Sequence, residues 1–266
     1  MSNIINKILE RTVGFNLKRA RIRKVKKING DPIYVEFVGI PGVGKTTLYE
    51  NVFKEVKSKW RNIHELHRIF MEHTNGIAAE SLLCYQVLAE SKMQSLGSRN
   101  FNGIDQMKLV KYFHSVLIAD SLVHLFNKKY NIMSDEGLIH NFGEGLLALS
   151  ISNSDEFKSL LKHRAVIYCH TSAEIIAKRI IEREKETGRL LPQHKLNSFE
   201  ELVNLQKKSL DQKNQLIGFL SKYDIPFLSI NTSNPMTENV DQVVNFFSEL
   251  TKNKEHESKC FIGKQF

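Results

Sequence analysis

The chain has 266 residues, which suffices for one large α/β domain and excludes more than two domains of ordinary size. Its composition is that of a globular protein, with 41% hydrophobic and 25% charged residues, and its three cysteines are too scattered for a disulfide framework or a zinc site. The net charge of +9 is concentrated in residues 1–30, which hold nine Lys or Arg and one acid, so the rest of the chain is nearly neutral.

The N-terminal arm, residues 1–30, has two readings. Residues 3–17 place Ile5, Ile8 and Leu9 on one helical face, which predicts a short amphipathic helix followed by the basic block LKRARIRKVKK. Alternatively, Asn29-Gly30 separates two strand-like runs and would form the turn of a hairpin. The basic block follows the apolar residues, which is the reverse of a secretory signal, and we expect a cytoplasmic protein.

From residue 31 onward the pattern alternates between strands and helices, which is typical of a parallel sheet covered by helices. The stretch 109–126 is apolar but carries charged residues and is not expected to span a membrane. We predict one domain over residues 31–250 and a polar tail over 251–266. The predicted strands are 33–38, 62–66, 130–135, 165–170 and 226–231, and the predicted helices are 46–60, 77–95, 103–128, 143–162, 172–187, one from 198, and one closing the domain.

A glycine-rich turn follows the first strand and matches G-x-x-x-x-G-K-[ST] at every defining position. Glycines allow the backbone N–H groups to point inward at phosphate oxygens, and the start of the next helix adds a positive dipole. Lys45 is placed to reach the outer phosphates and the Thr46 hydroxyl to bind Mg²⁺. The motif therefore predicts binding of a nucleoside triphosphate by Gly39, Ile40, Pro41, Gly42, Val43, Gly44, Lys45, Thr46 and Thr47.

Two acids, Asp135 and Glu136, end the third predicted strand. An acid at this position of a nucleotide-binding sheet helps to hold the magnesium ion, which is the role expected of Asp135. Glu136 could orient a nucleophile, and Glu65, after the second strand, is the other candidate for that role. The alternative for Asp135 and Glu136 is that they only cap the next turn.

Arginines cluster on the helix predicted over 172–187. Arg179 and Arg183 lie one turn apart on one face, and Arg189 follows Gly188. This spacing favours a helical lid that places positive charge over transferring phosphates. The competing interpretation is that neighbouring glutamates pair with these arginines on the surface.

Taken together, the loop GIPGVGKTT, the acid after the third strand, the helix AKRIIERE with its following GR, and the segment PFLSINTSNPMTENVDQVVNFF resemble nucleoside and nucleoside-monophosphate kinases. The resemblance is greatest to thymidylate-kinase-like and deoxynucleoside-kinase-like enzymes and covers about residues 33–250. It implies a three-layer P-loop NTPase fold: a five-stranded parallel sheet, helices on both faces and a helical lid. Thymidylate kinases have Asp-Arg where this chain has Asp135-Glu136, and deoxynucleoside kinases have Glu-Arg-Ser nearby. The arginine that those families place beside the acceptor is missing here, so the resemblance implies phosphoryl transfer without specifying a nucleoside acceptor.

The expected function is therefore that of an ATP- and Mg²⁺-dependent kinase acting on a small molecule, either a nucleoside or nucleotide or a cell-envelope sugar. Lys45, Glu136, Arg179, Arg183 and Arg189 would be catalytic, and Thr46 and Asp135 would hold the metal. Two alternatives are an ATPase that couples hydrolysis to a partner, suggested by the Asp-Glu pair, and a nucleic-acid end kinase.

The N-terminal arm, residues 1–30, also indicates what the protein could bind. A basic helix with an apolar face suits an anionic membrane surface, which would place residues 1–27 on the inner face of the membrane. Packing on the protein itself or pairing in a homodimer is the other interpretation. The arm has a single aromatic residue, Phe15, and therefore no stacking platform for nucleic acid.

Overall fold

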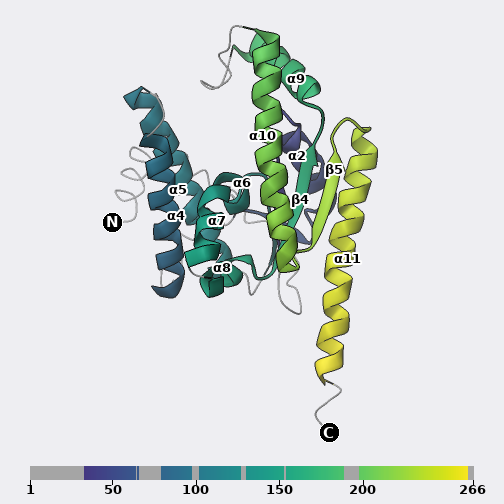
Figure 1. Cartoon of the computed structure of the whole chain (residues 1–266). Coiled ribbons are helices and arrows are strands. Elements are labelled where there is room, and N and C mark those ends of the chain that lie inside the picture. The colour runs from purple at the N-terminus through teal and green to yellow at the C-terminus, as the bar shows by residue number, and fades with distance from the viewer. Residues whose placement is uncertain are drawn as a thin grey trace, which may run out of the picture.

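The computed structural model describes residues 33–63, 65, 79–97, 102–126, 130–152, 154–188 and 198–262. Five parallel strands form one sheet in the order β2-β3-β1-β4-β5. The strands are β1 (Tyr34–Val38), β2 (Trp60–Asn62), β3 (Asn131–Ser134), β4 (Arg164–His170) and β5 (Phe227–Asn231). Strand β1 is central and pairs with β3 on one side and β4 on the other, so the loop that follows it opens at the middle of the sheet. Figure 1 shows the neighbouring strands β4 and β5 side by side.

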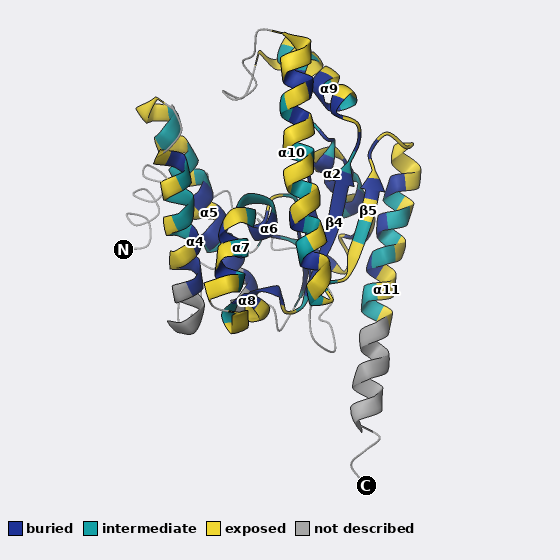
Figure 2. Cartoon of the chain, in the orientation of Figure 1, coloured by how far each residue is buried: buried dark blue, intermediate teal, exposed yellow. Residues whose placement is uncertain are grey.

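Helices cover both faces of this sheet, which confirms the predicted fold class. One face packs against α2 (Lys45–Val56), α9 (Ala173–Thr187) and α11 (Met236–Ile262). The other face packs against α4 (Ala79–Gly97), α5 (Gly103–Phe126), α6 (Leu138–Asn141), α7 (Gly143–Ser152) and α8 (Ser154–Leu161). Helix α10 (Phe199–Leu220) contributes to both cores, and Figure 2 shows its exposed outer side together with the buried strand β4.

The alternation of side chains along β1 explains how the two cores form. Val35 and Phe37 are completely buried on the α2 side, and Val38 is completely buried on the opposite side. Glu36 shares the side of Val38 and is equally buried, so a carboxylate lies inside the second core. A strand that is covered on both faces normally consists of apolar residues throughout, and Glu36 is the exception in β1.

Several boundaries differ from the sequence prediction. Strand β2 begins at Trp60, earlier than expected, because Trp60 is a buried core residue that packs on Phe247 with ring centroids 4.2 Å apart. The segment predicted as helix over 143–162 is two helices, α7 and α8, preceded by the short α6. Helix α11 continues to Ile262, so residue 250 is not the end of an element.

Capping residues explain where two helices start. Ser172 and Ser198 precede α9 and α10, and each hydroxyl accepts a hydrogen bond from a backbone N–H three residues on. The N-terminal arm and Arg189 lie outside the described residues. Among the helices that are described, none is long and apolar enough to cross a bilayer.

Candidate functional site

The phosphate-binding loop predicted from the sequence lies between β1 and α2 at the centre of the sheet. Gly42 and Gly44 have φ of +87° and +95°, a region that side chains with a β-carbon rarely adopt. Gly44 is the N-cap of α2 and provides no side-chain cap. The first N–H groups of α2 are therefore not capped by its N-cap side chain, and together with the helix dipole they favour an anion at this point.

Lys45 connects this loop to the end of β3. Its side chain is buried, its Nζ donates a hydrogen bond to the backbone carbonyl of Asp135, and the same atom lies 3.7 Å from a carboxylate oxygen of Glu136. The parallel pairing of β1 with β3 brings these residues together, since the carboxyl ends of neighbouring parallel strands lie at one edge of the sheet. The structure thus places Lys45 next to Asp135 and Glu136.

The space above this loop is a cavity of about 670 Å³. It is wide enough for a triphosphate and part of a second molecule. Its walls include the predicted Lys45, Thr46, Glu136, Arg179 and Arg183. Further lining residues are Ile40, Pro41, Gly42, Gly44, Thr47, His140 and Thr187.

Two residues of the cavity region, Thr46 and Asp135, are suited to bind a magnesium ion. The exposed side chain of Thr46 lines the cavity, and Asp135 lies at the adjacent strand end. No cluster of three or more His, Cys, Asp or Glu side chains suited to a metal occurs within the described ranges. Magnesium in nucleotide sites is commonly held by one or two protein oxygens and otherwise by water and phosphate.

Helix α9 is a fixed wall of the site. Ile176 and Ile180 are buried, and a β-carbon on Gly42 would come within 2.7 Å of Ile180. The Arg179 guanidinium donates to the carbonyl of Val43 at 2.7 Å and to the carbonyl of Thr232 at 2.9 Å. Arg179 therefore ties the phosphate-binding loop to the segment after β5, a bracing role that the sequence interpretation did not foresee.

Arg183 is the more available of the two described arginines. It is exposed and lines the cavity one turn beyond Arg179. Helix α9 then ends at Gly188, whose φ is +63°. Because α9 packs into the core, the helix itself forms a wall of the cavity, and Arg189 lies outside the described part of the chain.

The two candidate orienting acids are separated. Glu136 lines the cavity and accepts a hydrogen bond from the hydroxyl of Tyr112, on α5. Burial first, and then the Glu136 charge, raise the pKa of Tyr112 above its ordinary value, so this hydroxyl keeps its proton and remains a donor. Glu65 instead lies 3.6 Å from Arg61 and is not among the residues that line the cavity.

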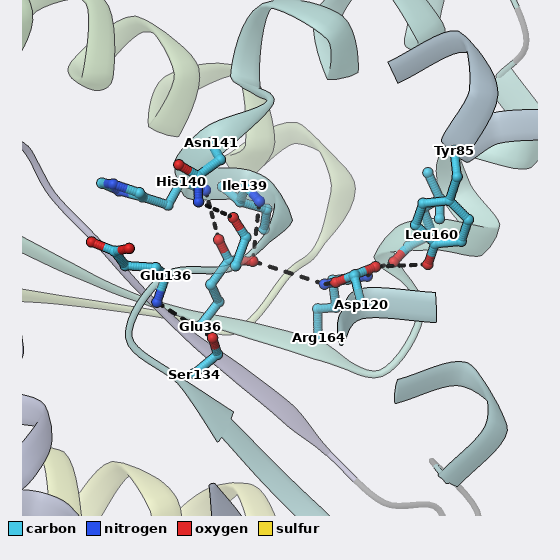
Figure 3. Close-up of polar contacts among 11 residues, drawn as sticks. Glu36, Tyr85, Asp120, Ser134, Glu136, Ile139, His140, Asn141, Leu160 and Arg164 are labelled. Carbon is cyan, nitrogen blue, oxygen red and sulfur yellow. Dashed lines mark hydrogen bonds and ion pairs between the residues drawn. The ribbon is translucent and has the colours of Figure 1, made fainter. Parts of the chain in front are cut away.

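A buried polar network supports the short helix α6 beside the site (Figure 3). The Glu36 carboxylate accepts hydrogen bonds from the backbone N–H groups of Ile139, at 3.1 Å, and His140, at 2.6 Å. It also lies 3.8 Å from the Arg164 guanidinium. Burial raises the pKa of Glu36 from 4.5 to about 7, although Arg164 and the His140 N–H favour its ionised form. Glu36 therefore fixes the first turn of α6 from inside the core.

Arg164 extends this network to α5 and α4. Its guanidinium donates two hydrogen bonds to Asp120, at 2.8 and 2.6 Å, and Asp120 also accepts from the Tyr85 hydroxyl at 2.7 Å (Figure 3). Sequence analysis did not assign these residues to the site. The available signals were a charge inside each apolar segment, Glu36 in β1 and Asp120 in α5, which require buried partners.

The short helix α6 also carries a histidine that sequence reasoning missed. His140 lines the cavity, and burial together with the charges of Lys45, Lys213 and Lys92 lowers its pKa well below its ordinary value. The imidazole is therefore neutral near pH 7. Its backbone carbonyl accepts a hydrogen bond from Lys213 of α10 at 2.6 Å, and the carbonyl of Asn141 accepts one from Lys92 of α4 at 2.8 Å.

Comparisons with known proteins give a general likeness only. No protein-family model matches the chain, and no curated protein matches it. A shikimate kinase from Bacteroides thetaiotaomicron is 10% identical, with 81% of this chain and 98% of that chain covered and a TM-score of 0.44. A deoxyadenosine kinase from M. mycoides with bound dATP is 15% identical, with 81% and 100% covered and a TM-score of 0.41. A gluconokinase from Sinorhizobium meliloti 1021 is 15% identical, with 86% and 99% covered and a TM-score of 0.40. At these values the similarity identifies no activity or substrate for this chain.

Proposed function

We propose that the protein is an ATP- and Mg²⁺-dependent kinase that transfers a phosphoryl group to a small-molecule acceptor. The observation that supports it is the content of one cavity of about 670 Å³, in which the phosphate-binding loop, Lys45, Thr46, Glu136 and Arg183 meet. Phosphoryl transfer depends mainly on positioning and on neutralising charge, and these residues offer both.

Each residue has a defined task in this proposal. The loop from Gly39 to Thr47 binds the triphosphate, and Lys45 leaves the Asp135 carbonyl to contact the outer phosphates. Thr46 and Asp135 hold the magnesium ion, which when bound neutralises phosphate charge. Arg183 approaches the transferring group from α9, while Arg179 keeps the loop in shape through Val43 and Thr232.

Glu136 leaves a second candidate function open. Its carboxylate is 42% exposed and 3.7 Å from Lys45, so it could orient a water molecule and make the protein an ATPase. In the kinase it would orient the acceptor hydroxyl instead. The two functions differ in what determines the rate of ADP formation.

ADP release distinguishes them directly. The full chain is incubated with ATP and Mg²⁺, with and without mixtures of nucleosides, nucleotides, sugars and sugar acids, and Lys45→Met serves as the inactive control. A kinase forms ADP faster when one mixture is added, and the phosphorylated product is identified by mass spectrometry. A steady rate that no mixture changes, but that Lys45→Met abolishes, would support the ATPase and contradict the kinase.

A further inference from the structure

A second cavity of about 430 Å³ adjoins the nucleotide-binding cavity. The two share Ile40, Pro41 and His140 in their walls, so the phosphate-binding loop and α6 separate them. Helix α4 contributes one side of the second cavity, α7 another and α10 a third. A molecule in this cavity would therefore lie next to the cavity in which we propose that the triphosphate binds.

Two lysines line this second cavity, and both are anchored to the α6 turn. Lys213 donates to the His140 carbonyl at 2.6 Å, and Lys92 donates to the Asn141 carbonyl at 2.8 Å. The Lys92 ammonium also lies 4.3 Å from the centre of the Phe113 ring. Both charges are thus held in place from different helices, α10 and α4, and point to one side of α6.

Positive charge is in excess around these lysines. The pKa of Lys213 is lowered from 10.5 to about 8, chiefly by burial; Glu36 opposes this shift, while the charges of Lys92 and Lys45 contribute to it. The one acid that lines the second cavity is Glu144, which is exposed. Like charges gathered in a partly dry space are costly, and a bound anion would offset that cost.

His140 provides an unused polar atom at the junction of the two cavities. Its Nδ1 is shielded from solvent and has no hydrogen-bond partner among the described residues. A buried polar atom without a partner costs stability and commonly marks the place of a ligand or a water molecule. Because the imidazole is neutral, it suits a hydroxyl group better than a second anion.

The remaining lining indicates a compact polar ligand. Phe142 is the one Phe, Tyr or Trp among the described residues that line the second cavity, so its lining is poor in the large rings that stack on a nucleobase. Uncharged polar side chains also line it, namely Ser91, Ser95, Asn141, Ser209, Gln212 and Gln215.

We propose that the second cavity is the acceptor site of the kinase and takes a small anionic alcohol, such as a sugar phosphate or a sugar acid. Lys92 and Lys213 bind its anionic group, and His140 Nδ1 binds the hydroxyl that faces the nucleotide. This assignment rests on the proposed kinase function and adds the chemical class of the acceptor.

The test measures binding to the full chain with its phosphate-binding loop already filled by a non-hydrolysable ATP analogue and Mg²⁺. The probes are ribose 5-phosphate and gluconate, with ribose and glucose as neutral counterparts. An anionic probe at ten times its dissociation constant should raise the Tm by about 3–6 °C, and its neutral counterpart should not. Lys213→Met should weaken binding of that probe at least about tenfold. Lys208→Met, an exposed lysine on the same helix, should change it less than about twofold.

The pH dependence gives an independent readout. Binding of gluconate, which stays fully ionised over this range, should weaken about tenfold between pH 7 and pH 9, because Lys213 loses its proton near pH 8. Ribose 5-phosphate, whose second pKa is about 6, should follow the same trend above pH 7. Lys213→Arg should remove this dependence, since arginine keeps its charge. The charged and titratable groups that face Lys213 are Lys92 on α4, Lys45 on α2, Glu36 on β1, Glu144 on α7 and His140 on α6.

His140→Leu separates the two parts of the acceptor site. This substitution should weaken the binding of ribose 5-phosphate. It should not change the binding of inorganic phosphate, which has no carbon-bound hydroxyl. Equal binding of charged and neutral probes, absence of binding by both anionic probes, or unchanged binding in Lys213→Met would each overturn the assignment. A chain that fails to bind the ATP analogue itself would instead refute the proposed function, so the two failures are distinguishable.

Discussion

A β-carbon placed on Gly137 would lie 2.6 Å from a carboxylate oxygen of Glu36. The backbone of Gly137 has an ordinary negative φ of −109°, so the obstacle to a side chain there is the carboxylate and not the backbone conformation. Because Gly137 has no side chain, α6 packs closely against Glu36, and the Glu36 carboxylate accepts hydrogen bonds from backbone N–H groups of that helix. The position of the α6 carbonyls that hold Lys92 and Lys213 depends on this close approach.

Gly137→Ala should therefore disturb both stability and the site. Overpacking of a buried position typically costs about 1–3 kcal/mol, and urea unfolding would measure that loss. The matched control is Gly218→Ala on α10, where a β-carbon meets no atom within 4 Å and should stabilise the helix by about 0.5–1 kcal/mol. Equal stability of the two variants would contradict the role given to Gly137.

Glu36 should make stability depend on pH. Its pKa is raised from 4.5 to about 7 by burial, so the folded state holds the proton more tightly than the unfolded chain. The contribution of Glu36 to the free energy of unfolding is about 3 kcal/mol. It is fully present below pH 4.5 and is lost as the pH rises through about 7.

The measurement is the free energy of unfolding in urea between pH 4.5 and 7.5, compared between the unmodified chain and Glu36→Gln. The glutamine variant cannot titrate at this position, so its stability should change less with pH than that of the unmodified chain. His140 contributes a pH dependence of the opposite sign, but it is present in both proteins and cancels in the comparison. Parallel profiles would show that Glu36 is ionised throughout.

Lys45→Met should remove a charge contact from the triphosphate while keeping the length of the side chain. Loss of one pre-placed contact of this kind costs about 3 kcal/mol, or a factor of about 10²–10³ in turnover. The readout is the rate of ADP formation, with Lys54→Met on the exposed side of the same helix as control. Turnover in Lys45→Met equal to that of the control would reject the assignment of Lys45.

The basic arm yields a prediction of another kind. Residues 1–27 contain all nine basic residues of the N-terminal region, and each near an anionic surface contributes about 1 kcal/mol. Deleting them should abolish sedimentation with anionic liposomes while leaving ADP formation within about twofold. Sedimentation that persists after the deletion would contradict the hypothesis that residues 1–27 bind the inner face of the membrane.

The sequence by itself determined the elements whose signals are local. The glycine spacing and Lys45-Thr46 located the phosphate-binding loop, because steric limits on φ and the start of a helix act within a few residues. The alternation of apolar strands and amphipathic helices determined the parallel sheet for the same reason. Ser172 and Ser198 marked the starts of α9 and α10 through hydrogen bonds that span three residues.

Only the tertiary structure decided how distant charges are used. Glu36, Asp120 and Arg164 are widely separated in sequence, and their pairing follows from which face of β1, β4 and α5 each occupies. Arg179 had the spacing expected of a lid residue, yet the packing of α9 against Gly42 directs its guanidinium to Val43 and Thr232. The second cavity with Lys92, His140 and Lys213 exists because α4, α6 and α10 meet there. The physical reason is that the energy of a charge depends on burial and on partners that the fold, and not the neighbouring sequence, supplies.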